Sequence, residues 1–313
     1  MKITSVFFRI IIGVAILGIL VYKIGMKSII DSISKVNIGY VLPMVLIVLF
    51  VNVFGTWKLL LFFKPTKISV SFPRLYRLYL LSGCLSSFIP GRVGELFLIY
   101  FLKKDKVRLG VGSAVVVMDK LIGVIVTFSL ALVGIFIFFS ITQSLKIIVL
   151  FLFFLFIVVY MVFSDFGRKL IKKYILRKWE SKFVGFSKTL FLLLKNKKAM
   201  FYNIMLSFVK WIVNSLVLYT LFIAMEYRVS LFVVVVVAST LAIVSLIPVS
   251  INGLGIKESA GVAFFAVAGV PVLVSTSVLL LFLIFNYLVA FVCIFLLLDA
   301  KEHKLRIREM LDQ

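Results

Sequence analysis

Long apolar segments separated by short polar connections fill most of the chain. An α-helix needs roughly 20 apolar residues to cross about 30 Å of hydrocarbon, and several of these segments reach that length. We therefore expect an all-α integral membrane protein with about six spanning helices. The predicted spans are residues 6–22, 38–63, 111–139, 147–164, 201–225 and 272–298.

Two further apolar stretches, residues 78–102 and 231–270, are interrupted near their middle by proline and glycine. Proline removes a helical hydrogen bond and glycine lowers helix stability, so each stretch should form two short helices around a break. Both breaks carry the pattern Ser-x-Ile-Pro, followed by glycine and then glutamate. The expected helix-breaking residues are Pro90, Gly91 and Gly94 in the first stretch, and Pro248, Asn252, Gly253 and Gly255 in the second.

Lysine and arginine are concentrated in three connections: residues 64–77 hold four, residues 103–108 hold four, and residues 165–198 hold eleven. Basic loops beside spanning helices usually face the cytoplasm. We therefore expect a multi-pass protein of the cell membrane with both termini cytoplasmic. The first loop carries three lysines and fits this topology less well, because the alternation of spans makes it external.

This topology makes each interrupted stretch a hairpin that enters the membrane and returns to the side from which it came. Residues 78–102 begin and end beside cytoplasmic loops, whereas residues 231–270 begin and end outside. Two re-entrant hairpins of opposite entry indicate an inverted repeat, with halves of about 1–160 and 161–313, within one transmembrane domain. Broken backbone inside a membrane needs protein or a water-filled cavity around it, and transporters place binding sites there.

The basic segment 168–198 predicts an amphipathic helix that lies in the headgroup plane. Apolar residues recur at helical spacing between lysines, as in helices that rest on a membrane surface. These apolar residues are Ile171, Tyr174, Ile175, Trp179, Phe183 and Phe186. A surface-bound helix without a further role is the simplest interpretation.

Composition and net charge indicate which classes of molecule this protein binds. Of 313 residues, 63% are hydrophobic, and the formal net charge is +23. Basic proteins can attract nucleic acid, but here the positive residues lie in loops between apolar spans, which favours membrane lipids with anionic or phosphate-bearing headgroups. Cys84 and Cys293 lie in apolar stretches and the sole histidine, His303, lies in the charged tail, so the sequence indicates neither a metal site nor a cofactor.

Ionisable residues inside apolar segments are costly and therefore mark candidate functional sites. Arg92 and Glu95 lie just after the first break, and Lys257 and Glu258 follow the second. Backbone N–H groups at the start of a half-helix attract anions, so the two cations would hold a phosphate-bearing headgroup while the two glutamates orient them. Asp119, expected to face the bundle interior, completes this substrate-binding set.

Several of these charges also have a structural interpretation. Both glutamates could cap half-helices by accepting hydrogen bonds from free N–H groups, and Arg92 could serve only as the partner of Glu95. Lys120 faces either the bundle or the cytoplasmic interface. Lys58 and Lys210 lie near the ends of the predicted spans and are expected to reach back to the interface.

Three strings resemble a known family: FIPGRVGELFLIYFL from Phe88, the Asp119–Lys120 pair, and IPVSINGLGIKESA from Ile247. They are similar to the transmembrane, flippase-like region of bacterial lysylphosphatidylglycerol synthases and of its standalone relatives in bacteria and archaea. In two-part members of that family a cytoplasmic domain adds lysine to phosphatidylglycerol, and the membrane region is thought to translocate the product. Because this chain ends a short way past its last apolar run, the resemblance implies lipid handling without aminoacyl transfer.

Two functions follow from these observations. The first is a lipid translocase that moves a phospholipid, or a polyprenyl lipid or glycolipid, with a polar headgroup between leaflets. The alternative is a membrane-embedded headgroup transferase or its accessory subunit, and a purely structural subunit is a third hypothesis. The sequence contains no GxSxG, HExxH or GxxxxGK[ST] string, which favours a transporter over an enzyme. It leaves open a homo-oligomer and a separate lipid-modifying enzyme as partners.

Overall fold

The computed structural model describes the whole chain except residues 1–2, 89–95, 171–182, 246–249, 251–252 and 312–313, and its described part is helical without strands. The all-α prediction is confirmed. Up to residue 163 the helices are α1 (Ile3–Ile24), α2 (Met26–Ile33), α3 (Val41–Phe63), α4 (Phe72–Phe88), α5 (Leu96–Lys104), α6 (Leu109–Phe138) and α7 (Ile141–Phe163). The others are α8 (Asp165–Leu170), α9 (Phe186–Lys195), α10 (Lys197–Ala224), α11 (Leu231–Val244), α12 (Ile256–Val267) and α13 (Val272–Leu311). Short 3₁₀ turns, η1 (Ile38–Tyr40) and η2 (Lys64–Thr66), flank α3.

Every predicted span is helical. Five helices are long and apolar enough to cross a membrane: α3 with its flanking turns, α6, α7, α10 and the part of α13 up to Leu297. The first predicted span falls in α1, which forms a sixth candidate together with α2. The two helices meet at an angle of 86°, and Gly25 between them has a φ of +93°, a conformation that residues with a side chain rarely adopt.

The first interrupted stretch folds back on itself. Its two helices, α4 and α5, pack against each other, and an ion pair joins their outer ends. Arg74, at the start of α4, donates two hydrogen bonds of 2.7 Å to the carboxylate of Asp105, which directly follows α5. Because the two outer ends lie together, the stretch is a hairpin that returns to its starting side.

The second interrupted stretch has the same form. Helices α11 and α12 pack against each other. The hydroxyl of Tyr227, just before α11, donates a hydrogen bond of 3.4 Å to the carbonyl of Gly269, just after α12. This stretch therefore also returns to the side on which it begins.

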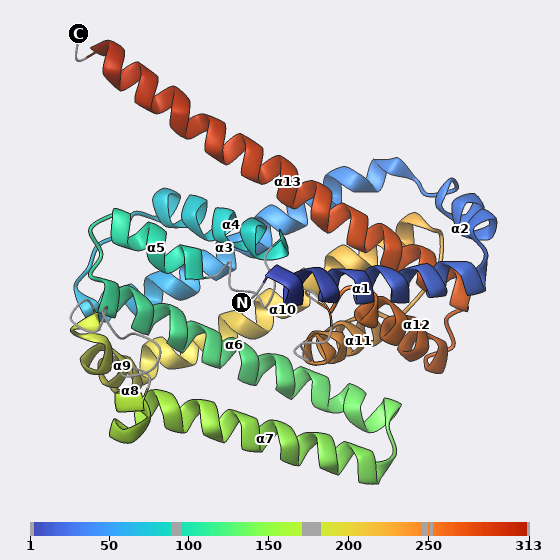
Figure 1. The fold of residues 1–313 in the computed structure, drawn as a ribbon, viewed down its shortest axis with the longest axis horizontal. Coiled ribbons are helices and arrows are strands. Elements are labelled where there is room, and N and C mark those ends of the chain that lie inside the picture. Colours follow the sequence, from blue (N-terminus) through green and yellow to red (C-terminus); the bar gives the residue numbers. More distant parts are fainter. Residues whose placement is uncertain (1–2, 89–95, 171–182, 246–249, 251–252, 312–313) are drawn as a thin grey trace.

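The two hairpins open at opposite ends of the bundle. The first follows η2, which packs against α9 at the end where α10 begins. The second follows the other end of α10, where the carbonyl of Ala224 accepts a hydrogen bond of 3.1 Å from the backbone N–H of Asn37. Figure 1 shows α8 and α9 at one end of the bundle, and α2 and the turn between α6 and α7 at the other. An inverted repeat relating the two halves stays a prediction.

A capped turn joins α6 and α7. The hydroxyl of Ser140 accepts a hydrogen bond from the N–H of Gln143, whose side chain accepts one from the N–H of Ser140. This reciprocal cap satisfies two N–H groups that the start of a helix leaves free. The hydroxyl of Ser144 donates to the carbonyl of Ile135 at 2.9 Å, and so ties α7 to the end of α6.

The basic segment 168–198 is divided rather than continuous. Within its described residues, Gly185 adopts a φ of +92°, and α9 is followed by a break at Asn196 before α10 begins. The buried face of α9, which includes Leu190 and Leu193, packs on α6. The placement of this segment in the headgroup plane stays a prediction.

Candidate functional site

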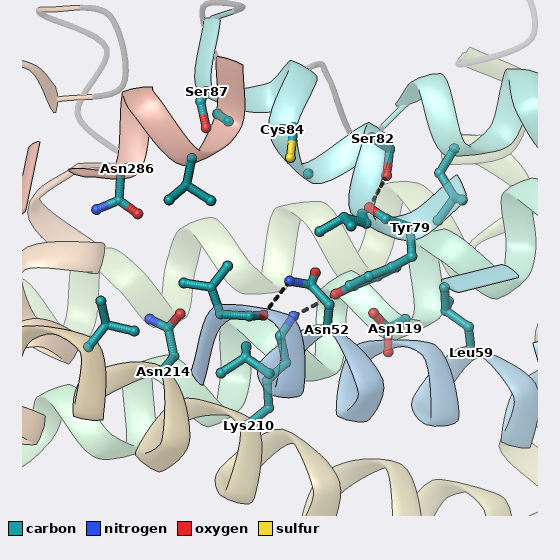
Figure 2. A pocket seen from close by; sticks show the side chains of 18 of the residues that line it. Asn52, Leu59, Tyr79, Ser82, Cys84, Ser87, Asp119, Lys210, Asn214 and Asn286 are labelled. Atoms are coloured by element: carbon teal, nitrogen blue, oxygen red, sulfur yellow. Dashed lines mark hydrogen bonds between the residues drawn. The ribbon is translucent and has the colours of Figure 1, made fainter. Parts of the chain in front are cut away.

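A partly open cavity of about 280 Å³ lies in the bundle and is lined mainly by α3, α4, α6, α10 and α13. Its wall combines apolar side chains with polar ones from each of these five helices (Figure 2). The polar lining residues are Asn52, Tyr79, Ser82, Ser87, Asp119, Lys120, Lys210, Asn214 and Asn286. In a segment that would otherwise face hydrocarbon such groups are costly, so their convergence on one space marks a candidate polar site.

A buried ion pair lies at the edge of this cavity, where Asp119 forms part of the lining. The ammonium of Lys58 on α3 lies 3.1 Å from the carboxylate of Asp119 on α6, and their side chains are 4% and 3% exposed. The side-chain amide of Asn203 on α10 donates hydrogen bonds to the same carboxylate oxygen, at 3.1 Å, and to the backbone carbonyl of Lys58, at 3.2 Å. Three helices are thus held together by one polar network, whose loss would leave charges buried without partners.

A second polar contact spans the cavity. The ammonium of Lys210 on α10 donates a hydrogen bond of 2.5 Å to the hydroxyl of Tyr79 on α4 (Figure 2). The ring of Tyr79 lies directly against Gly55 of α3, where a methyl group would overlap it. The missing side chain at Gly55 therefore creates the space that lets the phenol reach Lys210.

Positive charge exceeds negative charge around the cavity. The charged residues among its described lining are Asp119, Lys120 and Lys210, and Lys58 lies behind Asp119. The charges of all three lysines act on Asp119. These four groups carry a formal excess of two positive charges. A cavity of this kind favours an anionic guest, because an anion restores the charge balance in a medium of low dielectric.

The site lies deep within the spanning helices. Lys210 is thirteen residues from the start of α10 at Lys197, about 20 Å along a helix that rises 1.5 Å per residue. The expectation that Lys58 and Lys210 reach back to the interface is therefore wrong. Lys58 is held by Asp119, and α10 begins one turn earlier than the predicted span, so Lys210 lies at mid-helix.

The sequence comparisons agree with this architecture. The family model for the lysylphosphatidylglycerol synthase TM region matches residues 6–293, which is most of the chain. The chain belongs to this family. It is also 25% identical to a UPF0104 membrane protein of Methanothermobacter thermautotrophicus over 295 residues, covering 86% of this chain and 87% of that protein. No solved structure matches the chain.

Of the residues proposed from sequence to bind substrate in this member of the lysylphosphatidylglycerol synthase TM family, Asp119 lines the described cavity. It faces the bundle interior as expected. Lys257 and Glu258 are not among the described lining residues, so their convergence with Asp119 is not observed. Arg92 and Glu95 lie outside the described residues, as do the expected break residues Pro90, Gly91, Gly94, Pro248 and Asn252.

In the described part of the second break, the backbone adopts conformations that glycine favours. Gly253 and Gly255 adopt φ values of +73° and +77°, and Gly255 packs directly against the backbone of Gly13 in α1. Glu258 is 5% exposed, and its carboxylate accepts a hydrogen bond of 2.7 Å from the N–H of Gly255. Glu258 thus caps α12, which is the structural interpretation that the sequence allowed for it.

The sequence by itself marks only part of the site. Nothing in it distinguishes Asn52, Tyr79 and Asn203 from other polar residues of the spans, and amides such as Asn214 and Asn286 more often join helices by hydrogen bonds than bind ligands. One signal was present on α10: positions 203, 210 and 214 are seven and four residues apart, which places them on one helical face. No comparable signal marks Tyr79, because its role depends on the close approach of α3 and α4 at Gly55.

Proposed function

We propose that this protein is a lipid translocase that moves a lipid with an anionic, phosphate-bearing headgroup between the leaflets of the cell membrane. The observation that carries the proposal is the cavity with Asp119, Lys120 and Lys210 in its wall, deep within the spanning helices. A charged headgroup meets a large barrier in the hydrocarbon core, because it loses its water without gaining partners. A polar cavity inside the bundle supplies those partners.

The cavity's size and charge fit a headgroup rather than a whole lipid. A volume of about 280 Å³ accommodates a phosphate with a small polar substituent, whereas the acyl chains remain in the surrounding hydrocarbon. Lys120 and Lys210 would pair with the phosphate as charge-assisted donors. The amides of Asn52, Asn214 and Asn286 can donate to and accept from hydroxyl groups on the headgroup.

Asp119 would help the bound headgroup to dissociate from the cavity. It already interacts with the charges of three lysines, so an incoming phosphate competes with a carboxylate that is part of the wall. Binding is then favourable without being so tight that the headgroup stays. A ligand moves a conformational equilibrium only by binding one state more tightly than the other, and this exchange of partners can supply that difference.

The expected orientation places both termini in the cytoplasm. The basic connections 64–77, 103–108 and 165–198 would then lie beside the anionic cytoplasmic leaflet. The first hairpin would open to the cytoplasm and the second to the outside. Each leaflet would thus have one hairpin opening at its own surface.

Reconstitution tests this function. Purified protein is placed in vesicles of phosphatidylglycerol and phosphatidylcholine that contain a trace of fluorescent phosphatidylglycerol, and dithionite is added outside to quench the exposed label. In protein-free vesicles the outer leaflet alone is quenched, and with the protein the inner label should become accessible as well. Mass spectrometry of the same lipids distinguishes the alternative, because a transferase changes the headgroup mass. Unchanged lipids together with a protected inner leaflet would contradict the proposal.

A further inference from the structure

One part of the cavity wall is apolar and is formed by α4 and α13. Leu80 and Cys84 of α4 and Ala290 of α13 line the cavity, and the same three residues form a small separate core where the two helices meet. We call this contact, together with Cys293 on the outer side, the α4–α13 seam. In Figure 2, Cys84 and Ser87 lie on the α4 side of the cavity, across from Lys210 and Asn214.

A pair of thiols crosses the seam. Cys293 of α13 packs against the cluster that contains Cys84 of α4. Cys84 lines the cavity and is buried, whereas Cys293 is half-buried and does not belong to the lining. The residues beside Cys293 on α13, Val292 and Phe295, are exposed on the surface of the bundle. At this point a small apolar cluster, formed mainly by α4 and α13, lies between the cavity and the surface of the bundle.

Another side of the cavity is held by polar contacts rather than by apolar packing. There the ion pair of Lys58 with Asp119, and the hydrogen bonds of Asn203, join α3, α6 and α10. Opening that side would separate buried charges in hydrocarbon, which is strongly unfavourable. Opening the seam exposes apolar side chains to lipid tails, which replace the lost contacts because they are as apolar as the side chains themselves.

We infer that the α4–α13 seam is the lateral opening through which a lipid headgroup passes between the cavity and the bilayer. This inference rests on the proposed function, and it assigns the route of the same substrate. The headgroup moves between the two helices while the acyl chains stay in the hydrocarbon outside. Because Cys84, Ala290 and Cys293 are small, Leu80 is the bulky side chain of the seam that has to move aside for this passage.

Three polar contacts fix the first half of α4. They indicate which helices have to move when the seam opens. Arg74 is paired with Asp105, the hydroxyl of Tyr76 donates to the carbonyl of Leu49 at 3.0 Å, and Tyr79 accepts from Lys210. These contacts hold the start of α4 against α3, α5 and α10. Separation at the seam therefore requires movement of α13 or of the last turns of α4.

The two native cysteines allow a direct test. With copper phenanthroline as catalyst, molecular oxygen converts the two thiols into a disulfide and takes up their two electrons and two protons as hydrogen peroxide. The cross-link ties α4 to α13 at the seam. Oxidised protein in the same vesicles, with the fluorescent lipid extracted from the outer leaflet by albumin in place of dithionite, which would reduce the disulfide, should lose its lipid movement, and dithiothreitol should restore it. Cys293→Ser protein, which cannot form the cross-link, should move lipid at the same rate before and after oxidation.

The possible results distinguish a failure of the seam hypothesis from a failure of the proposed function. If the reduced protein moves no lipid, the proposed function fails. If the reduced protein moves lipid and the cross-linked protein moves it equally fast, the seam is not the opening. Failure of the cysteines to cross-link would show that they do not meet across the seam, and would overturn the inference as well. Mass spectrometry of peptides from the oxidised protein establishes whether the disulfide has formed.

Discussion

Tyr79 and Lys210 meet across the cavity because Gly55 leaves space for the tyrosine ring. A methyl group at position 55 would overlap the ring, so Gly55→Ala should displace Tyr79 and disturb its hydrogen bond with Lys210. Overpacking of this kind typically costs about 1–3 kcal/mol. We expect a lower unfolding temperature in detergent and slower lipid movement in vesicles.

Gly123→Ala provides the matched control for that substitution. Gly123 also lies within a spanning helix, α6, but a methyl group there would meet no heavy atom within 4 Å. Alanine is the better helix former, so this variant should be at least as stable as the parent. Equal stability and activity of the two variants would contradict the close contact at Gly55.

The pair of Lys58 and Asp119 should behave as a unit. Removing one partner, as in Lys58→Met, leaves a buried charge and should cost about 3–5 kcal/mol of stability. The double variant Lys58→Met/Asp119→Leu removes both charges and should recover most of that loss. Its lipid movement should remain impaired, because the acidic wall of the cavity is gone. Thermal unfolding and the vesicle assay on the same preparations test both points, and a double variant as unstable as Lys58→Met would argue against the pairing.

Much of the fold could be predicted because the membrane imposes simple rules. Apolar length predicted the spans, proline and glycine predicted the two breaks, and the basic loops predicted that each broken stretch returns to its own side. The pairing of Arg74 with Asp105 and the contact of Tyr227 with Gly269 bear out that last point. The bend at Gly25 was not predicted, since a single glycine between apolar runs is a weak signal.

The site was harder to predict because it depends on which helices are neighbours. Asp119 was placed correctly, but its partner Lys58 is 61 positions away in the chain, on a helix whose rotation the sequence does not specify. The distance of Lys58 and Lys210 from the predicted helix ends places both at the interface. Tertiary contacts with Asp119 and Tyr79 decide their positions instead.

Two substitutions of Glu258 distinguish the role of its charge from the role of its capping hydrogen bond. Glu258→Gln keeps an oxygen that can accept the N–H of Gly255, so its stability should stay close to the parent's. Glu258→Ala loses the cap, which typically costs about 0.5–2 kcal/mol. Chemical unfolding of both variants measures the difference. A folded Glu258→Gln protein that no longer moves lipid would instead assign the charge a part in transport.

Membrane topology can be tested by cysteine labelling in a background without Cys84 and Cys293. A cysteine at Asp105 should react with an impermeant maleimide only from the cytoplasmic side, and one at Arg228 only from outside. These positions lie at the open ends of the two hairpins. Labelling of position 105 from outside, or of position 228 from inside, would reverse or refute the proposed orientation.

The central claim is that the cavity lysines carry an anionic headgroup across the membrane, and Lys210→Gln in the vesicle assay tests it most directly. Losing one charge-assisted hydrogen bond, worth about 1.5–3 kcal/mol, should slow the movement of fluorescent phosphatidylglycerol roughly ten- to hundredfold. Lys146→Gln is the matched control, because it removes the same charge from an exposed position on α7. We predict that the folded Lys210→Gln protein is slow and that Lys146→Gln moves lipid at the parent rate. Parent-like movement by folded Lys210→Gln protein would contradict the claim.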